Sequence, residues 1–437
     1  MKIIESLRQK WENLDQDFII TDETSCSFKD LELIDLNFLD EVKQGDVVAL
    51  IGEFDALTVI SFITLLDKGA IVVPLTNINK NDHNNYFDIL KVDLVVQKGV
   101  IINSFSNYPK DNIIQSLIKD KDSGIIFFSS GTSGTPKAIV HKTSLLLKRF
   151  STPRKSYKTL NFLMFDHMGG INTLFHTIFN GGTIIGCKDR SVSTILELCT
   201  RFKIEVLPAT PTFLRMLLMS GLIPKKIPKS IKIITYGTEL MDQATLNDLC
   251  NLLPDVDFRQ TYGLSEFSVL RVKSKFRNSL YMKIGGEGVE TKIVNNLLFI
   301  KSKFAMLGYI NATSPFDIEG WYNTKDLVEK DAEGYIKIIG RDSDQVNVGG
   351  LKFMLSDVYN IAMTNKNIKQ VIIHAKQNNI AGQHIEAIIE LNENSSISKD
   401  DLFNFFNSSL PKHMAPKKIT LEEITLNHRL KKNLKTE

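Results

Sequence analysis

The sequence predicts an α/β fold. A large amino-terminal domain of parallel-type sheets covered by helices carries a small β subdomain and precedes a small α+β carboxyl-terminal domain. Short apolar runs rich in β-branched residues alternate with longer segments of helical period, which is the pattern of a parallel sheet covered by helices. After Tyr281 the pattern changes to short strands and turns, and near Gly340 a smaller α/β series begins. These two changes predict the subdomain and the second domain.

The first unit along the chain is a compact βαβ motif. Val47 to Ile51 is predicted to be a strand, Ala56 to Leu66 a helix, and Ala70 to Pro74 the next strand. A second series of buried strands and helices follows. Its strands are Gly124 to Phe128, Thr183 to Gly186, Val206 to Pro208 and Ile231 to Thr235, and its helices are Ser193 to Arg201 and Pro211 to Met219.

The last third of the chain contains shorter elements. Leu297 to Lys301 and Tyr335 to Ile339 are predicted strands of the β subdomain. We place the domain boundary at Arg341 and Asp342, which gives domains of residues 1–340 and 341–437. The second domain is predicted to contain helices at Asp357 to Thr364 and Asp401 to Ser408, and strands at Gln370 to Ala375 and Glu386 to Leu391.

Composition and charge indicate a globular protein without a global electrostatic preference. Of its 437 residues, 43% are hydrophobic and 24% are charged, as is ordinary for folded domains. With 53 basic and 50 acidic residues the net charge is only +3, so no overall field attracts nucleic acid or an anionic membrane. We therefore expect neither as a partner, and any bound anion must be held locally.

The cysteines and the amino terminus favour a cytoplasmic location. The four cysteines form no CxxC pair or metal-ligand spacing, so we expect reduced, mostly buried thiols. Residues 1–17 carry charges throughout and lack the apolar core of a signal peptide. The most hydrophobic region, Val47 to Leu75, is interrupted by four charged residues, so no transmembrane helix is expected.

The most informative segment is SSGTSGTPK, Ser129 to Lys137, which directly follows a predicted strand. Its two glycines let the backbone amides turn inward, its five hydroxyls add donors and its lysine adds charge, which together suit a polyphosphate. It is not a Walker A loop, because Pro136 precedes the lysine and Ala138 follows it. On its own the segment also fits a polar turn after a strand.

With this segment the sequence resembles the adenylate-forming (AMP-binding) superfamily, which includes acyl-CoA synthetases, luciferases and the adenylation domains of peptide synthetases. SSGTSGTPKA is similar to the phosphate loop of that family, and further segments match its motifs in the same order. These are YGTEL (236–240), YGLSE (262–266), WYNTKDL (321–327) and the GRD segment that starts at Gly340. Residues 44–50, 68–74 and 410–416 also resemble family landmarks, so the likeness runs nearly end to end.

The resemblance implies one ATP site that uses Mg²⁺. Tyr262 would stack on adenine, Glu266 would hold the metal beside Lys137, and Asp326 would accept hydrogen bonds from the ribose hydroxyls, with Arg341 adding a polar contact. Taken alone, Tyr262 also fits a packing residue and Asp326 a turn residue. The other nucleotide-binding residues implied are Ser129, Ser130, Gly131, Thr132, Ser133, Gly134, Thr135, Gly237, Thr238, Glu239, Thr261, Gly263, Ser265 and Lys352.

The segment Phe165 to Asn172 resembles the family's entrance to the acyl pocket, where acyl-CoA synthetases often place a histidine followed by small residues. Our register puts His167 in that place as a candidate catalytic residue, which favours a carboxylic acid without an amino group. Two alternatives stay open. Asp166 could pair with the amino group of an aminoacyl substrate, as in peptide synthetases, and His167 also fits simple packing under a glycine turn.

The resemblance further implies two half-reactions. A carboxylate oxygen attacks the α-phosphorus of ATP and pyrophosphate leaves; a thiolate then attacks the acyl carbon and AMP leaves. In this family the small carboxyl-terminal domain is mobile. It would rotate about Asp342 between the steps and bring Gly349, Gly350 and Lys352 toward the thiol acceptor.

The carboxyl terminus departs from the family pattern. The family usually carries a lysine there that bridges the substrate carboxylate and the α-phosphate. The ungapped register puts Arg429 at this place, which keeps the charge but does not reproduce the geometry of an ammonium group. A shifted register would instead bring Lys431 or Lys432. A second departure is Lys325, where a glycine is common before the ribose carboxylate.

Three interpretations of function remain. The leading one is an acid-thiol ligase that activates a carboxylic acid with ATP and passes the acyl group to coenzyme A. A second is an enzyme that loads an acyl or aminoacyl group onto the phosphopantetheine of an acyl carrier protein. A third is a degenerate member that binds nucleotide with little turnover, which Arg429 suggests. The sequence does not identify the acid or the oligomeric state.

Overall fold

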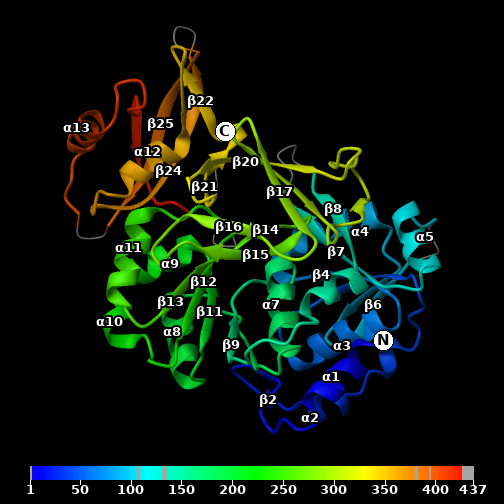
Figure 1. The fold of residues 1–437 in the computed structure, drawn as a ribbon. Coiled ribbons are helices and arrows are strands. Elements are labelled where there is room, and N and C mark those ends of the chain that lie inside the picture. Colours follow the sequence, from blue (N-terminus) through cyan, green and yellow to red (C-terminus); the bar gives the residue numbers. More distant parts are fainter. Residues whose placement is uncertain (1, 106–108, 130–134, 379–381, 393–394, 426–437) are drawn as a thin grey trace.

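The structure is a computed structural model that describes residues 2–105, 109–129, 135–378, 382–392 and 395–425 (Figure 1). Across these residues the strands form three seven-stranded sheets, which make up most of the chain, and two smaller sheets near the carboxyl end. Two of the large sheets are mainly parallel and the third is antiparallel. The α/β architecture predicted from the sequence is confirmed.

The first large sheet has the order β19-β8-β7-β4-β3-β5-β6, with parallel pairing from β7 through β5 and antiparallel strands at both edges. Its strands are β3 (Val47–Ile51), β4 (Ile71–Leu75), β5 (Leu94–Gln97), β6 (Val100–Ser104), β7 (Gly124–Ser129), β8 (Lys137–Lys142) and β19 (Gly308–Tyr309). The helices in this part of the chain are α3 (Ala56–Asp67), α4 (His83–Leu90), α5 (Asn112–Lys119) and α6 (Thr143–Leu147). Strands β3 and β4 are buried along their whole length, as the continuous apolar runs predict.

The second large sheet has the order β13-β12-β11-β9-β10-β1-β2 and is parallel except for the pair β1–β2. Its strands are β1 (Ile19–Ile20), β2 (Ser25–Cys26), β9 (Thr159–Asn161), β10 (Ile184–Gly186), β11 (Val206–Ala209), β12 (Ile233–Tyr236) and β13 (Asp257–Gln260). Helices α8 (Val192–Arg201), α9 (Pro211–Met219), α10 (Ile223–Lys226) and α11 (Gln243–Leu252) accompany it. The remaining amino-terminal helices are α1 (Ile3–Trp11), α2 (Phe28–Glu32) and α7 (Met168–Ile178), with 3-10 turns at Asn37–Leu39, Asn77–Asp82 and Lys148–Phe150.

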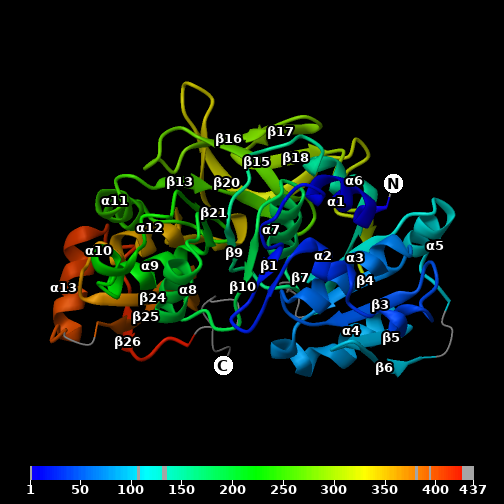
Figure 2. The same cartoon turned by 90° about the horizontal axis from the view of Figure 1, so that it is seen from below.

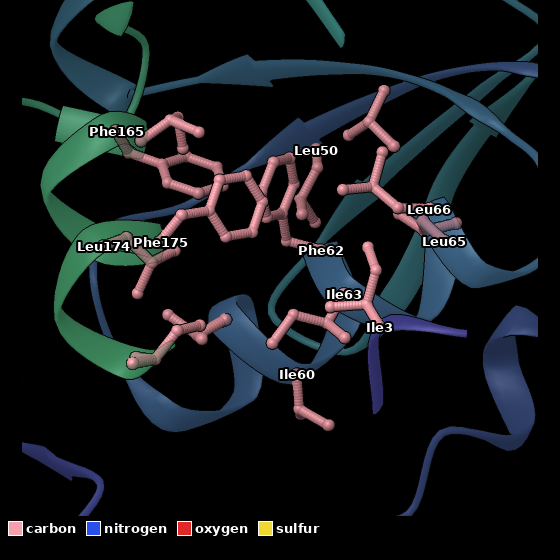
Figure 3. Packing of buried hydrophobic residues seen from close by; sticks show 14 of the residues in the cluster. Ile3, Leu50, Ile60, Phe62, Ile63, Leu65, Leu66, Phe165, Leu174 and Phe175 are labelled. Carbon is pink, nitrogen blue, oxygen red and sulfur yellow. The ribbon is translucent and has the colours of Figure 1, made fainter. Parts of the chain in front are cut away.

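A continuous apolar core joins the two mainly parallel sheets. Figure 3 shows Phe165 and Phe175 on the α7 side facing Phe62 of α3. The ring centroid of Phe62 lies 5.6 Å from that of Phe165 and 5.8 Å from that of Phe175. Because these rings are fully buried, helix α7 is fixed rigidly between the sheets.

The antiparallel sheet is the β subdomain, with the order β14-β15-β16-β21-β20-β18-β17. Its strands are β14 (Tyr262–Leu264), β15 (Ser268–Ser274), β16 (Met282–Gly285), β17 (Val289–Val294), β18 (Leu297–Ser302), β20 (Tyr322–Lys330) and β21 (Ile336–Arg341). Figure 1 shows β15 above helix α7, so the subdomain covers the region between the two mainly parallel sheets.

The carboxyl-terminal segment has a hydrophobic core of its own, which includes Val358, Ile389 and Phe406. Its elements are a 3-10 turn at Asp342–Asp344, β22 (Gln345–Val348), β23 (Leu351–Met354), α12 (Leu355–Ala362), β24 (Ile368–Asn378), β25 (Gly382–Leu391), α13 (Lys399–Ser409) and β26 (Lys418–Leu421). Figures 1 and 2 both place this segment next to α9 and α11. A separate core fits the predicted second domain, and the boundary at residue 341 stays a prediction.

The predicted elements are all present, with ends that differ by a few residues. Two helices begin two residues before their predicted starts: α12 at Leu355 instead of Asp357, and α13 at Lys399 instead of Asp401. The Asp357 carboxylate accepts a hydrogen bond from the backbone N–H of Met354 (3.1 Å), so this aspartate lies within the first turn. Helix α9 has the predicted bounds because Thr210 caps it and Pro211 occupies its first position.

The four cysteines are all free and buried, which confirms that prediction. No helix in the described part of the chain is long and apolar enough to cross a membrane.

A buried carboxyl group follows strand β3 and predicts a pH dependence of stability. Burial raises the pKa of Glu53 to about 7, although Arg190 lies 3.9 Å away and opposes the shift. The pKa of Glu53 is higher in the folded protein than in the unfolded chain, so protonation of this carboxyl favours the folded state. This contribution to stability is complete below pH 4.5 and is lost as the pH rises through about 7. Glu53→Gln removes the titrating group, so its free energy of unfolding relative to the unmodified protein should rise by about 1 to 3 kcal/mol between pH 5 and 8.

Urea unfolding of both proteins across this pH range measures the difference. The exposed Glu41→Gln serves as the matched control. A Glu53→Gln difference that does not change with pH would contradict the assignment.

Candidate functional site

A lysine and a carboxylate flank one tyrosine at the start of β8. Lys137 is the first residue of β8 and pairs with Ser129, the last residue of β7. Its Nζ lies 5.2 Å from the centre of the Tyr309 ring, and the Tyr309 hydroxyl donates a hydrogen bond to Glu266 Oε1 (2.7 Å). Burial and the Glu266 carboxylate raise the pKa of Tyr309, so the hydroxyl stays protonated and donates. The sequence predicted Lys137 and Glu266 as partners but missed Tyr309.

The end of the predicted phosphate loop is held by an asparagine from a distant part of the chain. Asn311 Oδ1 accepts the backbone N–H of Ala138 (2.9 Å), and its Nδ2 donates to the carbonyl of Pro136 (2.8 Å). In this loop Ser129 is half-buried and Thr135 is exposed. The predicted residues Ser130, Gly131, Thr132, Ser133 and Gly134 lie outside the described residues.

A second polar group surrounds the predicted ribose carboxylate. Asp326 is buried, and its two oxygens are held separately. The Tyr262 hydroxyl donates to Oδ2 (2.5 Å), and the Arg341 Nε lies 2.8 Å from Oδ1. Burial raises the pKa of Asp326, and Arg341 and the Tyr262 hydroxyl oppose that shift. The structure therefore brings together Tyr262, Asp326 and Arg341, and the stacking of Tyr262 on adenine stays a prediction.

Tyr322 connects the two groups electrostatically. Burial is the largest cause of its raised pKa, the Glu266 carboxylate adds to the shift, and the Arg341 guanidinium opposes it. Tyr322 lies on β20, the strand that also carries Asp326, so the charges of Glu266 and Arg341 both act on a residue of that strand. The convergence of the three motifs on one nucleotide stays a prediction.

The YGTEL motif packs against the residue that precedes YGLSE. A Cβ on Gly237 would lie 2.2 Å from the Thr261 Oγ1, so only glycine fits there. Thr238 is exposed with a φ of +70°. Glu239 Oε2 accepts hydrogen bonds from the Thr212 backbone N–H (3.2 Å) and hydroxyl (2.7 Å), so its carboxylate lies at the start of helix α9. Gly263 is exposed, and the Ser265 side chain is half-buried.

A buried histidine that the sequence did not single out positions the YGLSE motif. His141 Nε2 donates a hydrogen bond to the Ser265 carbonyl (2.6 Å). Burial lowers the pKa of His141 to about 4, so the ring is neutral at physiological pH. Because Ser265 adjoins Glu266, this bond helps to fix the carboxylate beside Lys137.

His141→Phe should therefore weaken both stability and activity. The variant leaves the Ser265 carbonyl without its donor, which costs about 1 to 3 kcal/mol of unfolding free energy. We expect the KM for ATP to rise more than the KM for the acid. Chemical denaturation and steady-state kinetics on one preparation measure both effects. If His141→Phe is less stable but its KM for ATP is unchanged, His141 contributes to packing and does not position the YGLSE motif for catalysis.

His167 begins helix α7. Its Nδ1 accepts the backbone N–H of Gly169 (2.9 Å), so the ring caps the helix. A Cβ on Gly170 would lie 2.1 Å from the Met164 carbonyl oxygen, which explains why the histidine is followed by small residues. The side chain of His167 is half-buried, and a catalytic role for it stays a prediction.

A cavity of about 620 Å³ lies between helix α7, the second parallel sheet and the β subdomain. Its lining includes Gly237, Thr238 and Thr261 from the predicted nucleotide site, together with Leu163 and Gly169 at the beginning of α7. His167 is not one of its lining residues. The volume suits a small organic molecule, and the cavity is continuous with the nucleotide motifs.

The remaining predicted residues lie in the carboxyl-terminal segment. Lys352 is exposed on β23 and pairs across the hairpin with Asn347. The predicted residues Arg429 and Lys431, like Lys432, lie outside the described residues. The structure therefore leaves open which cation replaces the usual lysine.

A magnesium ion would find one suitable carboxylate here. Among the residues that the structure describes, no three or more histidine, cysteine, aspartate or glutamate side chains gather as a metal site. Mg²⁺ in nucleotide sites is typically held by one or two carboxylates, substrate phosphates and water, so the single carboxylate of Glu266 fits that pattern.

Comparisons with known proteins agree with this geometry. Residues 88–297 match the family model described as AMP-binding enzyme. The chain is 23% identical over 448 residues to 4-coumarate--CoA ligase-like 6 of Arabidopsis thaliana, covering 87% of this chain and 78% of the relative. It is 22% identical over 415 residues to 2-succinylbenzoate--CoA ligase of Listeria innocua, covering 88% and 87%.

A solved structure shares the fold. The anthranilate CoA ligase AuaEII in complex with anthranoyl-AMP superposes with a TM-score of 0.81 at 18% sequence identity, covering 97% of this chain and 94% of that one. These matches show that residues 88–297 resemble AMP-binding enzymes and that the chain shares the fold of AuaEII.

Proposed function

We propose that this protein is an acid-thiol ligase, which activates a carboxylic acid with ATP as an acyl-adenylate and passes the acyl group to coenzyme A. Two contacts support the proposal: Tyr309 lies between Lys137 and Glu266, and the Asp326 carboxylate is held by Tyr262 and Arg341. An organic-sized cavity lined by Gly237, Thr238 and Thr261 adds to this support. Charge for phosphates, a carboxylate for a metal and a carboxylate for ribose are the three groups that an ATP-dependent acid activation needs.

The relatives support the thiol acceptor. Several similar curated proteins are named CoA ligases, and they differ in their acids, which include 4-coumarate and 2-succinylbenzoate. The structural neighbour AuaEII is an anthranilate CoA ligase bound to an acyl-adenylate, anthranoyl-AMP. An acceptor thiol and an adenylate intermediate are therefore what we expect here, while the acid is left open.

In the first half-reaction an oxygen of the substrate carboxylate attacks the α-phosphorus. The bond from this phosphorus to the bridging oxygen breaks, and pyrophosphate leaves. Lys137 would neutralise phosphate charge, and the Asp326 carboxylate would accept hydrogen bonds from the ribose hydroxyls and so fix the α-phosphorus in line. A magnesium ion held by Glu266 would supply further charge neutralisation at the phosphates.

In the second half-reaction a thiolate attacks the acyl carbon and AMP leaves. We propose that the segment from residue 341 onward then moves about Asp342, which starts an exposed 3-10 turn directly after β21. Gly349, Gly350 and Lys352 form an exposed hairpin end that can approach the acceptor. In the structure α12 contacts α9 through Tyr359, whose ring lies 5.4 Å from the guanidinium carbon of Arg215.

We also propose a cytoplasmic location, which the four free, buried cysteines support. Coenzyme A is the preferred acceptor because the relatives are CoA ligases, and phosphopantetheine on a carrier protein offers the same thiol chemistry.

Pyrophosphate release with ATP and a panel of carboxylic acids, measured with and without coenzyme A, tests the proposal. We expect acid-dependent release and an acyl-CoA product. If pyrophosphate is released but the acyl group is transferred only to a carrier protein, the acceptor is the carrier protein and not coenzyme A. If no acid in a broad panel gives pyrophosphate release, the proposed activity is contradicted.

A further inference from the structure

One end of the cavity is basic, and the side chains that carry this charge have no role in the reaction proposed above. The lining contains seven lysine and arginine side chains and a single carboxylate, that of Glu287. Two of the seven are already neutralised: Lys303 pairs with Glu287 (2.8 Å) and Arg259 pairs with Asp257 (2.6 Å). The other five retain their charge.

Three arginines from two segments of the chain, Arg149 and Arg154 in one and Arg271 in the other, dominate this end. Arg149 donates to the carbonyls of Phe267 (2.8 Å) and Val269, which accounts for its position. In the described part of the chain, the guanidinium groups of Arg154 and Arg271 form no ion pair or hydrogen bond with the protein. Arg271 extends across Gly286, where an added Cβ would lie 2.9 Å from its Cδ, so glycine leaves room for this side chain.

The arginines are close enough to act on one another. Burial, together with the charges of Arg271 and Arg154, lowers the pKa of Arg149 to about 10. Burial and Arg154 also lower the pKa of His176, which lines the same end. Like charges held close together repel one another, and Glu287 is the single carboxylate in the lining, so a bound anion would lower the free energy of this end of the pocket.

Helix α7 sets the distance between the two ends of the cavity. Gly169, next to the nucleotide motifs, and His176, next to the arginines, both line it. They are seven residues apart on one helix, a rise of about 10 Å. Arg154 is tied to the far end, because its backbone N–H donates to Asn180 Oδ1 (2.5 Å) and Asn180 Nδ2 donates to the His176 carbonyl (2.6 Å).

We infer that the acid taken by this protein carries a second anionic group, such as a second carboxylate, which Arg154 and Arg271 bind about 10 Å from the carboxylate that reacts. The inference rests on the proposed function, since it assigns the substrate of the same cavity. Paired guanidinium groups suit a planar carboxylate, which can accept two hydrogen bonds from one side chain.

Matched acids test the inference by pyrophosphate release. Adipate, suberate and sebacate are compared with hexanoate, octanoate and decanoate, and a carboxyphenyl-propanoate with phenylpropanoate. We expect a lower KM for the diacid of each pair at the best length. Arg154→Gln and Arg271→Gln should each raise the KM for diacids by about 10- to 100-fold and leave that for monoacids nearly unchanged.

Arg201→Gln, which removes an exposed arginine on α8, is the charge-matched control and should change neither KM. Arg154→Lys should restore part of the diacid preference. The competing explanation is that Arg154 merely stabilises the carboxyl-terminal end of α7. In that case Arg154→Gln would lower the melting temperature without acid and leave the diacid to monoacid ratio unchanged, which would overturn the inference.

Thermal unfolding with each acid gives a second measurement that does not need turnover. Diacids should raise the melting temperature more than their monoacid partners, and this difference should vanish in Arg271→Gln. Equal shifts would overturn the inference. If the protein turns over monoacids and diacids equally well, the inference is overturned and the proposed function stands. If diacids raise the melting temperature but no acid gives pyrophosphate release, the proposed function alone is contradicted.

Discussion

Glu266→Gln is expected to lower kcat for adenylation by about 100- to 1000-fold, because it removes the carboxylate that we propose holds a metal near Lys137. Glutamine retains the shape of the side chain, and its carbonyl oxygen can still accept the Tyr309 hydroxyl. The fold should therefore be kept, with a free energy of unfolding within about 1 kcal/mol of the unmodified protein.

Acid-dependent pyrophosphate release at several magnesium concentrations measures the effect. The variant should need more magnesium for half-maximal rate. Glu290→Gln, which changes an exposed residue on β17, is the matched control and should behave like the unmodified protein. An unchanged kcat for Glu266→Gln would show that Glu266 takes no part in catalysis.

Asp326→Asn is expected to raise the KM for ATP by about 10- to 100-fold. The amide cannot serve both Arg341 and the ribose as a charged acceptor, although it can still accept the Tyr262 hydroxyl. If Asp326 binds the ribose hydroxyls, the unmodified protein should use deoxyadenosine triphosphates poorly, and the variant should discriminate less against them.

The ratio of kcat/KM for ATP to that for each deoxy analogue measures this discrimination in both proteins. Circular dichroism controls for folding, since Asp326 is buried. If Asp326→Asn lowers kcat/KM for ATP and for the deoxy analogues in equal proportion, Asp326 stabilises the fold and does not recognise the ribose.

Much of the fold was predictable because its signals are local. The continuous apolar runs of β3 and β4 enclose a helix that begins at the capping residue Asp55, and Thr210 with Pro211 marks the start of α9. The antiparallel pairing of β8 with β7 was not predicted, since the direction of a short apolar strand is set by the chain reversal before it and not by its own residues.

The candidate site was predictable as motifs but not as contacts. Hydrogen bonds across 173 residues hold Ala138 to Asn311, and bonds across 124 residues hold His141 to Ser265. Nothing in the local pattern of either residue indicates such a partner. Tyr309 was missed for the same reason: it acts only because β19 pairs with β8.

The basic end of the cavity was hidden in the same way. Arg149, Arg154 and Arg271 come from two segments more than a hundred residues apart, and the net charge of +3 gives no sign of them. The arginines come close to one another only in the folded chain, where β15, which carries Arg271, lies over helix α7.

The central claim is that one nucleotide contacts both polar groups at once. A crystal structure of the protein with a non-hydrolysable ATP analogue tests it most directly. The account predicts ribose hydroxyls within about 3 Å of the Asp326 carboxylate and the phosphates beside Lys137 and Glu266. A nucleotide bound elsewhere, or one that reaches only one of these two groups, would contradict it.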